Sequence, residues 1–240
     1  MSAPQPAQTS GFAGLRQTSW ALLGLLAWGD ELSGYDLKKW ADYSVRFVFW
    51  SPSFSQVYSE LKKLEKAGYV SSRTIVEDED RVKPKRVYRI TPAGLDVLRE
   101  WSVEAPVDLP VLKHPTMLRL MFGFLSEPEQ LKHVLREHIS YVDGMSRQAA
   151  IDVRDTSKDP EWAFQNLALR WAERYYAAER ELATELLDEI DATFEKVQQS
   201  GSEPGQPPVR RPGSLRGIAK RYDAAEYEEA ARRELPSDDA

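Results

Sequence analysis

The side chains with the clearest chemistry lie in residues 53–67, SFSQVYSELKKLEKA, whose apolar positions recur with a helical period. At about 100° per residue, the side opposite the apolar positions carries small hydroxyl residues and cations: Ser55, Ser59, Lys62, Lys63 and Lys66. Hydroxyls and the amide of Gln56 are able to hydrogen-bond base edges, and lysines neutralise phosphates. This face is predicted to contact DNA, and an ordinary solvated face of an amphipathic helix is the alternative.

Catalytic and metal chemistry have weaker signals. The chain has no cysteine, which excludes disulfides, thiol catalysis and Cys-ligated metal centres. No GxSxG, GxGxxG or P-loop pattern occurs. His133 and His138 are five residues apart, so one helix points them in different directions and they do not chelate an ion as an i,i+4 pair would. We expect neither enzyme activity nor a metal or other cofactor.

Capping signals predict the helices that position the lysine-bearing face. Residues 20–28 (WALLGLLAW) are apolar all round, which is typical of a short buried helix. Ser33, followed three residues later by Asp36, is predicted to cap a second helix. Ser53 and Gln56 repeat this pattern at the start of the lysine-bearing helix.

A predicted β-hairpin follows. Residues 69–76 are rich in β-forming types, and residues 86–91 alternate between apolar and polar. The charged segment between them begins with four acids at 77–80 and ends with basic residues: Arg81, Lys83, Lys85 and Arg86. We expect the tip of the loop either to point these acids away from phosphates or to contribute little to DNA binding. Thr91-Pro92 opens another helix. This order of elements is that of a winged helix-turn-helix, in which the second helix of the turn enters the major groove and the hairpin loop follows the DNA backbone.

Three segments carry a more specific signal: ALLGLLAWGDELSGYDLKKW, FWSPSFSQVYSELKKLEKAGYV and KPKRVYRITPAGLDVLREW. As a set, they resemble the PadR family of bacterial transcriptional regulators over about residues 18–103. The resemblance implies DNA contacts from six residues: Ser55, Gln56, Tyr58, Lys62, Lys85 and Arg86. Members of the family commonly have proline after the tyrosine, where this chain has Ser59, a difference that should not break the helix.

Residues 104–199 are predicted to be helical. Ser126 to Glu129 reads as a capping box, and Asp159-Pro160 opens a long helix to about Val197. Its apolar residues, spaced by three and four from Phe164 onward, predict one stripe that needs a partner helix, either from the same chain or from another chain. The longer PadR-like proteins dimerise through such a region. We therefore expect a homodimer interface at Leu167, Trp171, Tyr175, Leu182, Leu186 and Ile190.

Aromatic residues suggest one further function. The family resemblance implies that a flat aromatic effector binds between protomers, and the candidates for this site are Trp101, Trp162, Trp171 and Tyr175. Packing in a core or interface is the alternative role for Trp171 and Tyr175. Trp40 and Trp50, on either side of the turn before the lysine-bearing helix, are expected to lie in the core.

The fold predicted for the 240 residues is mainly α with a small β-hairpin wing. Its divisions are a flexible lead-in at 1–17, a DNA-binding domain at 18–103, a helical dimerisation region at 104–199 and a flexible tail at 200–240. The formal net charge is −6, but residues 11–103 carry +2 and residues 104–199 carry −7, so a local basic face is compatible with an acidic chain.

These features predict a homodimeric, sequence-specific repressor that binds double-stranded DNA at an inverted repeat and is released by a small aromatic effector. The alternative is a winged-helix protein-interaction module without specific DNA binding, and a small-molecule-processing enzyme is a remoter class. No apolar run approaches the 18 residues of a membrane span, and the N-terminus lacks a secretory signal, so we expect a cytoplasmic protein without membrane contact.

Overall fold

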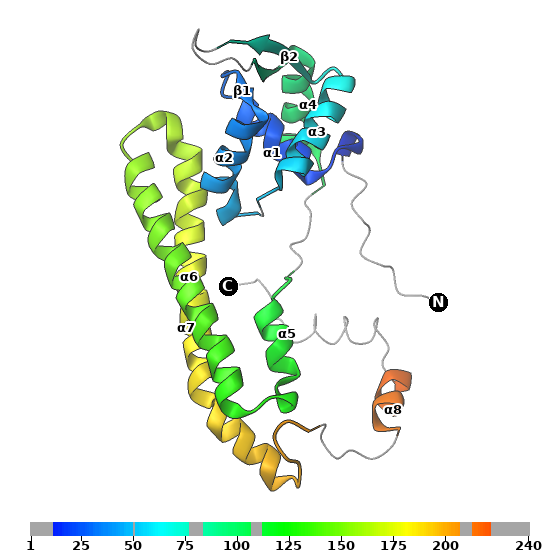
Figure 1. Cartoon of the computed structure of the whole chain (residues 1–240), viewed down its shortest axis with the longest axis vertical. Helices are drawn as coiled ribbons and strands as arrows, with labels where there is room; N and C mark the ends of the chain where they lie inside the picture. Colours follow the sequence, from blue (N-terminus) through cyan, green and yellow to red (C-terminus); the bar gives the residue numbers. More distant parts are fainter. Residues whose placement is uncertain (1–11, 50, 77–83, 107–111, 207–212, 222–240) are drawn as a thin grey trace, which may run out of the picture. The chain divides into compact units, whose positions relative to one another are not determined.

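The structure is a computed structural model that describes residues 12–49, 51–76, 84–106, 112–206 and 213–221 (Figure 1). The chain forms two compact units. One combines Ala7–Lys113 with Ser140–Glu181, and the other combines His114–Ile139 with Leu182–Ala240. Among the described residues, no helix has the length and apolarity needed to cross a membrane.

The first unit contains the predicted winged helix-turn-helix. Its helices are α1 (Gln17–Leu26), α2 (Gly34–Tyr43), α3 (Phe54–Lys66) and α4 (Pro92–Glu104). Its strands are β1 (Leu32–Ser33), β2 (Val70–Ile75) and β3 (Lys85–Ile90). Two short 3-10 helices lie at Phe12–Gly14 and Val45–Phe47. The order of these elements along the chain, followed in Figure 1 from blue to green, is the one that the sequence predicts.

The sheet has one strand more than expected. β2 and β3 form the predicted antiparallel hairpin, and β1 pairs antiparallel with the other edge of β3, in the order β1-β3-β2. Tyr88 at the centre of β3 is opposite both Leu32 and Ser72. A two-residue strand has too few positions to show an alternating pattern in the sequence. It attaches the loop between α1 and α2 to the hairpin.

Leucine-rich faces of α1 and α3 form the core of the winged helix. Val57, Leu61 and Leu64 on α3 are fully buried. They pack with a larger apolar set: Trp20, Leu22, Leu23, Leu26, Leu37, Val70, Tyr88, Ile90 and Val97. Burial of each leucine side chain is worth about 1.5–3 kcal/mol, so this cluster fixes which side of α3 faces outward.

Side-chain caps set the helix starts as the sequence predicts. Ser33 accepts a hydrogen bond from the Asp36 N–H, and the Asp36 carboxylate accepts one from the Ser33 N–H. Ser53 and Gln56 form the same reciprocal box on α3. Beyond the end of α3, Gly68 takes a left-handed φ of 79°, which favours glycine.

Two long helices complete the first unit. The last part of α6 (Pro128–Thr156) packs against the first part of α7 (Ala163–Gln199), which a 3-10 turn at Pro160–Trp162 precedes. Their shared core contains Met145, Ala149, Leu169, Ala172 and Phe47. The Tyr176 hydroxyl also donates to the Phe47 carbonyl (3.4 Å), and the Tyr43 hydroxyl donates to Asp152 (3.3 Å). These helices therefore pack directly against the winged helix.

The second unit contains α5 (Pro115–Met121), the start of α6, the end of α7 and α8 (Ser214–Arg221). Leu131 and Leu135 of α6 pack with Ile190 and Phe194 of α7. The predicted Ser126–Glu129 capping box is wrong, because α6 begins at Pro128 and the side chain that reaches back is Gln130, to the Glu127 N–H (3.1 Å). Residues 222–240, the last part of the predicted tail, lie outside the described residues.

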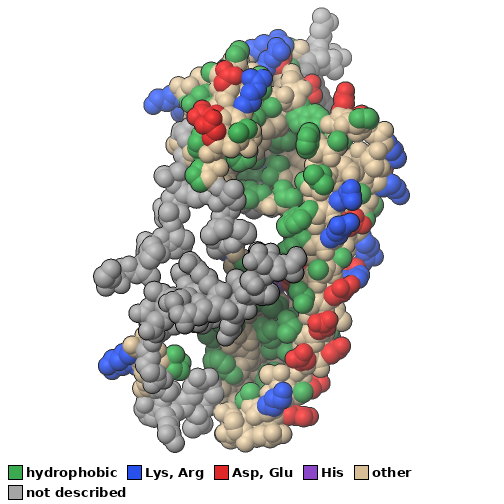
Figure 2. Space-filling model, turned by 180° about the vertical axis from the view of Figure 1, so that it is seen from behind, with side chains coloured by type: hydrophobic (Ala, Val, Ile, Leu, Met, Phe, Trp, Pro, Cys, Tyr) green, Lys and Arg blue, Asp and Glu red, His purple; other side chains and the backbone are tan. Residues whose placement is uncertain are grey.

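The apolar residues of α7 do not form one continuous seam. Ile190 is buried in the chain's own core and Leu186 packs beside it, whereas Leu167 and Leu182 are 62% and 56% exposed. From Phe164 to Phe194 the chain advances 30 residues, and at 100° per residue the stripe turns by about 120° around the helix. Figure 2 shows hydrophobic side chains at the surface along the long helices.

Candidate nucleic-acid interface

A buried carboxylate attaches α3 to α1. Glu60 is only 6% exposed and accepts hydrogen bonds from the Ser19 hydroxyl (2.8 Å) and the Lys63 ammonium (2.5 Å). Burial alone would raise the pKa of Glu60, but the bonds from Lys63 and Ser19 outweigh it and hold the pKa below its usual value. Lys63, predicted to contact DNA, is therefore paired within the domain.

The outward side of α3 carries the predicted polar face. Ser55, Ser59, Lys62 and Lys66 are all exposed. Among the described residues, Lys62 and Lys66 take part in no ion pair, so nothing there competes with a phosphate for their ammonium groups. Small hydroxyl residues allow a helix to approach a DNA groove closely, and the lysines that follow them are able to bind phosphates of the DNA backbone.

Gln56 has two roles at the start of α3. Its Oε1 accepts the Ser53 N–H at 2.8 Å and so completes the cap, while its amide NH₂ stays on an exposed side chain. The Ser55 hydroxyl lies 3.0 Å from that of Ser53. Because the oxygen accepts this bond, the amide NH₂ is the group left as a hydrogen-bond donor, and such a donor suits the O6 and N7 acceptors of guanine.

Tyr58 packs on the first residue of α2. A Cβ at Gly34 would lie 2.4 Å from the Tyr58 Cε1, far inside van der Waals contact, so glycine is what lets the ring sit there. The ring is still half exposed, and it bridges the two helices of the turn at their outer surface.

The basic residues of the hairpin form ion pairs with carboxylates of the same domain. The Lys85 ammonium lies 3.0 Å from the Asp36 carboxylate. Arg86 donates to Glu65 on α3 (2.8 Å) and to Ser72 on β2 (2.9 Å). The bonds that Ser72 and Arg86 donate hold the pKa of Glu65 below its usual value. Lys83 and the acids at 77–80 lie outside the described residues.

Two exposed aromatic rings adjoin the polar face and were not predicted. Tyr35, near the start of α2, stacks with Phe54, the first residue of α3, at 5.9 Å between centroids and 11° between planes. The Lys39 ammonium lies 4.7 Å from the centre of the Tyr35 ring. Phe54 lies on the apolar side of the helix by its spacing, but it is 45% exposed because it precedes the first buried turn of α3. An aromatic residue within the first two positions after each serine cap was the available signal.

Residues 22–100 match the family described as "Transcriptional regulator PadR-like family". This segment of the chain is thus similar to PadR-like regulators, and it is called the PadR-like domain below. The family consists of transcriptional regulators rather than enzymes, as expected from the sequence. The negative transcriptional regulator PadR of Bacillus subtilis (strain 168) is 34% identical over 108 residues, which are 45% of this chain and 57% of that relative. The chain thus matches somewhat more than half of the curated relative's length.

Solved structures share the fold beyond the PadR-like domain. The crystal structure of Bacillus subtilis PadR in complex with operator DNA aligns with a TM-score of 0.60 at 24% identity, covering 73% of this chain and 99% of that one. Bacillus subtilis PadR in complex with p-coumaric acid aligns with a TM-score of 0.54 at 23% identity, covering 72% and 94%. The mainly helical fold with a small winged sheet is confirmed.

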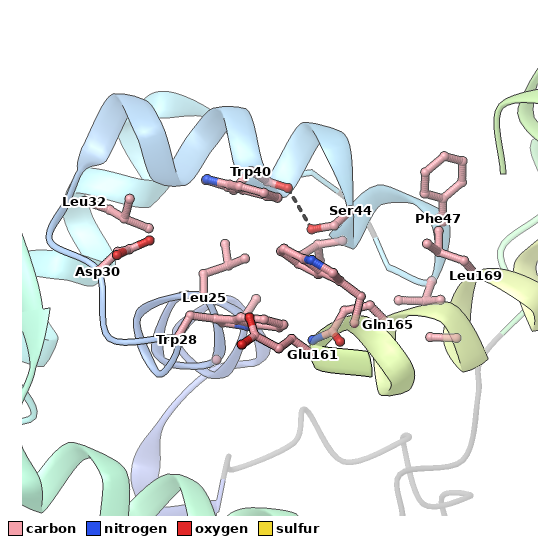
Figure 3. Close-up of a pocket in the computed structure, with 16 residues that line it drawn as sticks. Leu25, Trp28, Asp30, Leu32, Trp40, Ser44, Phe47, Glu161, Gln165 and Leu169 are labelled. Atoms are coloured by element: carbon pink, nitrogen blue, oxygen red, sulfur yellow. Dashed lines mark hydrogen bonds between the residues drawn. The ribbon is translucent and has the colours of Figure 1, made fainter. Parts of the chain in front are cut away.

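A cavity of about 620 Å³ lies between the PadR-like domain and the start of α7, within the first unit (Figure 3). Its walls include three tryptophans. Trp162 stacks on Trp28 at 4.4 Å and 22°, and its ring centroid is 6.0 Å from that of Trp40, at 17°. This volume is within the range of small-molecule sites, and indole faces are suited to stacking with flat rings.

The four residues predicted to bind an effector lie at three different places. Trp162 lines the cavity, whereas Trp101 stacks on Trp20 (5.1 Å), and Trp171 and Tyr175 stack on each other on α7. Trp40, expected in the core, is half-buried and lines the cavity instead. Trp50 lies outside the described residues. Because the cavity is lined by two segments far apart in the chain, residues 21–48 and residues 161–169, the sequence spacing does not predict this grouping.

Proposed function

We propose that this protein is a transcriptional repressor that binds double-stranded DNA sequence-specifically as a homodimer. The observation that carries the proposal is the outward face of α3, where hydroxyls and the Gln56 amide precede Lys62 and Lys66, which form no ion pair with any residue that the structure describes. The likeness of the fold to Bacillus subtilis PadR in complex with operator DNA, and the relative's role as a negative regulator, support it. Such a repressor acts in the cytoplasm, where the chromosome is.

The dimer is proposed to form through the exposed apolar side of α7. Leu167, Trp171, Tyr175 and Leu182 present large side chains to solvent there. A second copy would cover them in a two-fold contact, in which the same patch of each protomer is buried. Two α3 helices would then enter successive major grooves, so the operator is an inverted repeat with half-sites about 34–36 Å apart.

Release from DNA is proposed to follow binding of a small aromatic effector in the cavity beside Trp28, Trp40 and Trp162. Bacillus subtilis PadR has been solved in complex with p-coumaric acid, an aromatic compound. The cavity is bordered by α2, the helix that precedes α3 in the turn, and by α7. A ligand there is placed to move the turn relative to the long helices of the same unit.

Genome-wide mapping of bound DNA, followed by binding titrations with the recovered site, tests the DNA-binding role. We expect the full chain to bind that duplex at least about 10³-fold more tightly than a scrambled duplex of equal length at the same salt concentration. Transcription from the mapped promoter should rise when the protein is removed. Equal affinity for both duplexes would instead support the protein-interaction module.

A further inference from the structure

We infer that the cavity selects flat aromatic compounds that are neutral or positively charged and donate hydrogen bonds, and that it disfavours aromatic carboxylates. The inference rests on the proposed effector role of the cavity and adds the chemical class of the ligand.

The first observation is the charge of the walls. Two carboxylates, Asp30 and Glu161, border the cavity, and no lysine, arginine or histidine is among its described lining residues. A carboxylate ligand would meet two like charges and no opposite one. Across about 5 Å of water, each like charge weakens binding by roughly fourfold, and an opposite charge strengthens it equally.

The second observation is an unpaired acceptor. Gln165 lines the cavity, and its Oε1, which is buried, has no hydrogen-bond partner among the described residues. The nearby Ser44 hydroxyl is already used, because it donates to the Trp40 carbonyl at 2.8 Å (Figure 3). A buried acceptor without a partner is unfavourable, so a ligand N–H or O–H at this position gains affinity that a ligand with only acceptors does not.

The third observation is the arrangement of the indoles. In Figure 3, Trp40 lies on one wall of the cavity and Trp28 on the opposite wall. Trp162 packs near both, at centroid distances of 6.0 and 4.4 Å. Indole faces are negative at their centres, so they attract cations as well as flat rings. All three observations favour a cationic or neutral donor.

Arg46 is the cation that could oppose this selectivity. It lies between the lining residues Val45 and Phe47 in sequence, but its guanidinium is over the Phe47 ring (5.0 Å). Burial raises the pKa of Asp152, and the charge of Arg46 partly offsets that effect. Since Arg46 does not line the cavity, we expect no ligand carboxylate to reach it.

Two acridines with the same three-ring frame test the inference. The full chain, free of DNA because acridines intercalate, is titrated calorimetrically with 9-aminoacridine, a cation with N–H donors, and with acridine-9-carboxylate. We expect 9-aminoacridine to bind at least tenfold more tightly. The double variant Asp30→Asn, Glu161→Gln should reduce that preference by tenfold or more, whereas Glu100→Gln, a matched change on exposed α4, should leave it unchanged.

Glu161→Lys is the complementary variant. Glu161 is exposed, so the change should not disturb folding, and it should favour the carboxylate. The inference is wrong if the wild type binds the carboxylate as tightly as the amine, or if Arg46→Gln abolishes carboxylate binding. Operator binding, measured separately, distinguishes the two proposals: loss of DNA specificity with selectivity intact contradicts only the proposed function. If acridine-9-carboxylate releases the protein from the operator and 9-aminoacridine does not, only the inference is contradicted.

Discussion

Lysines of equal charge have unequal roles in this domain because their surroundings differ. Lys62 has no carboxylate partner among the described residues, whereas Lys63 is paired with buried Glu60, and Lys85 lies 3.0 Å from Asp36. A paired lysine offers less net attraction to a phosphate than an unpaired one. If the domain binds DNA as proposed, we therefore expect its phosphate contacts to come chiefly from Lys62 and Lys66 at the end of α3.

Lys62→Ala should weaken binding to operator and random duplexes alike, because a phosphate contact carries no sequence information. The plot of log K against log salt should become shallower by about 0.9 for each phosphate that is no longer neutralised, or about two for a dimer. Salt titrations of both duplexes measure this. Lys158→Ala, at an exposed position just beyond the end of α6, is the control. An unchanged slope for Lys62→Ala would show that this face is only solvated.

Glu60→Ala should destabilise the domain by about 1–3 kcal/mol, because it leaves the Ser19 hydroxyl and the Lys63 ammonium without their partner. The pKa of Glu60 is lowered on folding from 4.5, so its ionised form stabilises the native state above that pH. This contribution is lost as the pH falls through the lowered value. Urea unfolding at pH 7 and below 4.5 should show a smaller loss on acidification for Glu60→Gln than for the wild type.

At the scale of elements, one glycine fixes how α4 meets the turn that follows α3. The Gly94 N–H donates to the Thr91 hydroxyl (3.1 Å), which itself donates to the Gly68 carbonyl (2.7 Å). A Cβ at Gly94 would lie 2.1 Å from the Tyr69 carbonyl oxygen and 2.9 Å from Ile90 Cγ1. The backbone is therefore too close at this point for any side chain.

Gly94→Ala should lower the free energy of unfolding by about 1–3 kcal/mol, since the added methyl group forces α4 away from the hairpin. Gly144→Ala, on the exposed side of α6 where a Cβ meets no atom within 4 Å, is the matched control. It should raise stability by about 0.5–1 kcal/mol through helix propensity. Thermal denaturation of both variants compares the two effects, and an equal response would contradict the close contact at Gly94.

At the scale of the whole molecule, the two faces of α7 separate folding from association. Ile190 and Phe194 are buried inside the chain, whereas Trp171 and Leu182 are exposed and lie on the face that we assign to the dimer. Charged substitutions on the exposed face should therefore weaken dimer formation, whereas a charged substitution on the buried face should lower the stability of the fold.

Trp171→Glu combined with Leu182→Glu should convert the dimer to a monomer of 27.4 kDa with an unchanged circular dichroism spectrum. Ile190→Glu should instead lower the melting temperature, because an unpaired charge would be buried. Light scattering and thermal melts distinguish these outcomes. A double variant that stays dimeric would place the interface elsewhere.

The sequence by itself determined the elements of this protein, because caps, hairpins and buried helix faces depend on residues close together in the chain. Ser33 with Asp36, Ser53 with Gln56 and the leucines of α3 all behave as their spacing predicts. The polar face of α3, carried by the same period, followed from that pattern too. The hydrogen-bond and ion-pair partners of side chains at the surface could not be predicted from spacing along the chain.

Only the tertiary structure decided which of the predicted DNA-binding side chains stay unpaired and where a ligand fits. The bond from Ser19 to Glu60 joins residues 41 positions apart, and that from Tyr43 to Asp152 joins residues 109 apart. Trp28, Trp40 and Trp162 meet across three helical segments. Such contacts depend on how helices pack, and packing is set by burial of the whole apolar surface, which leaves no fixed spacing in the sequence.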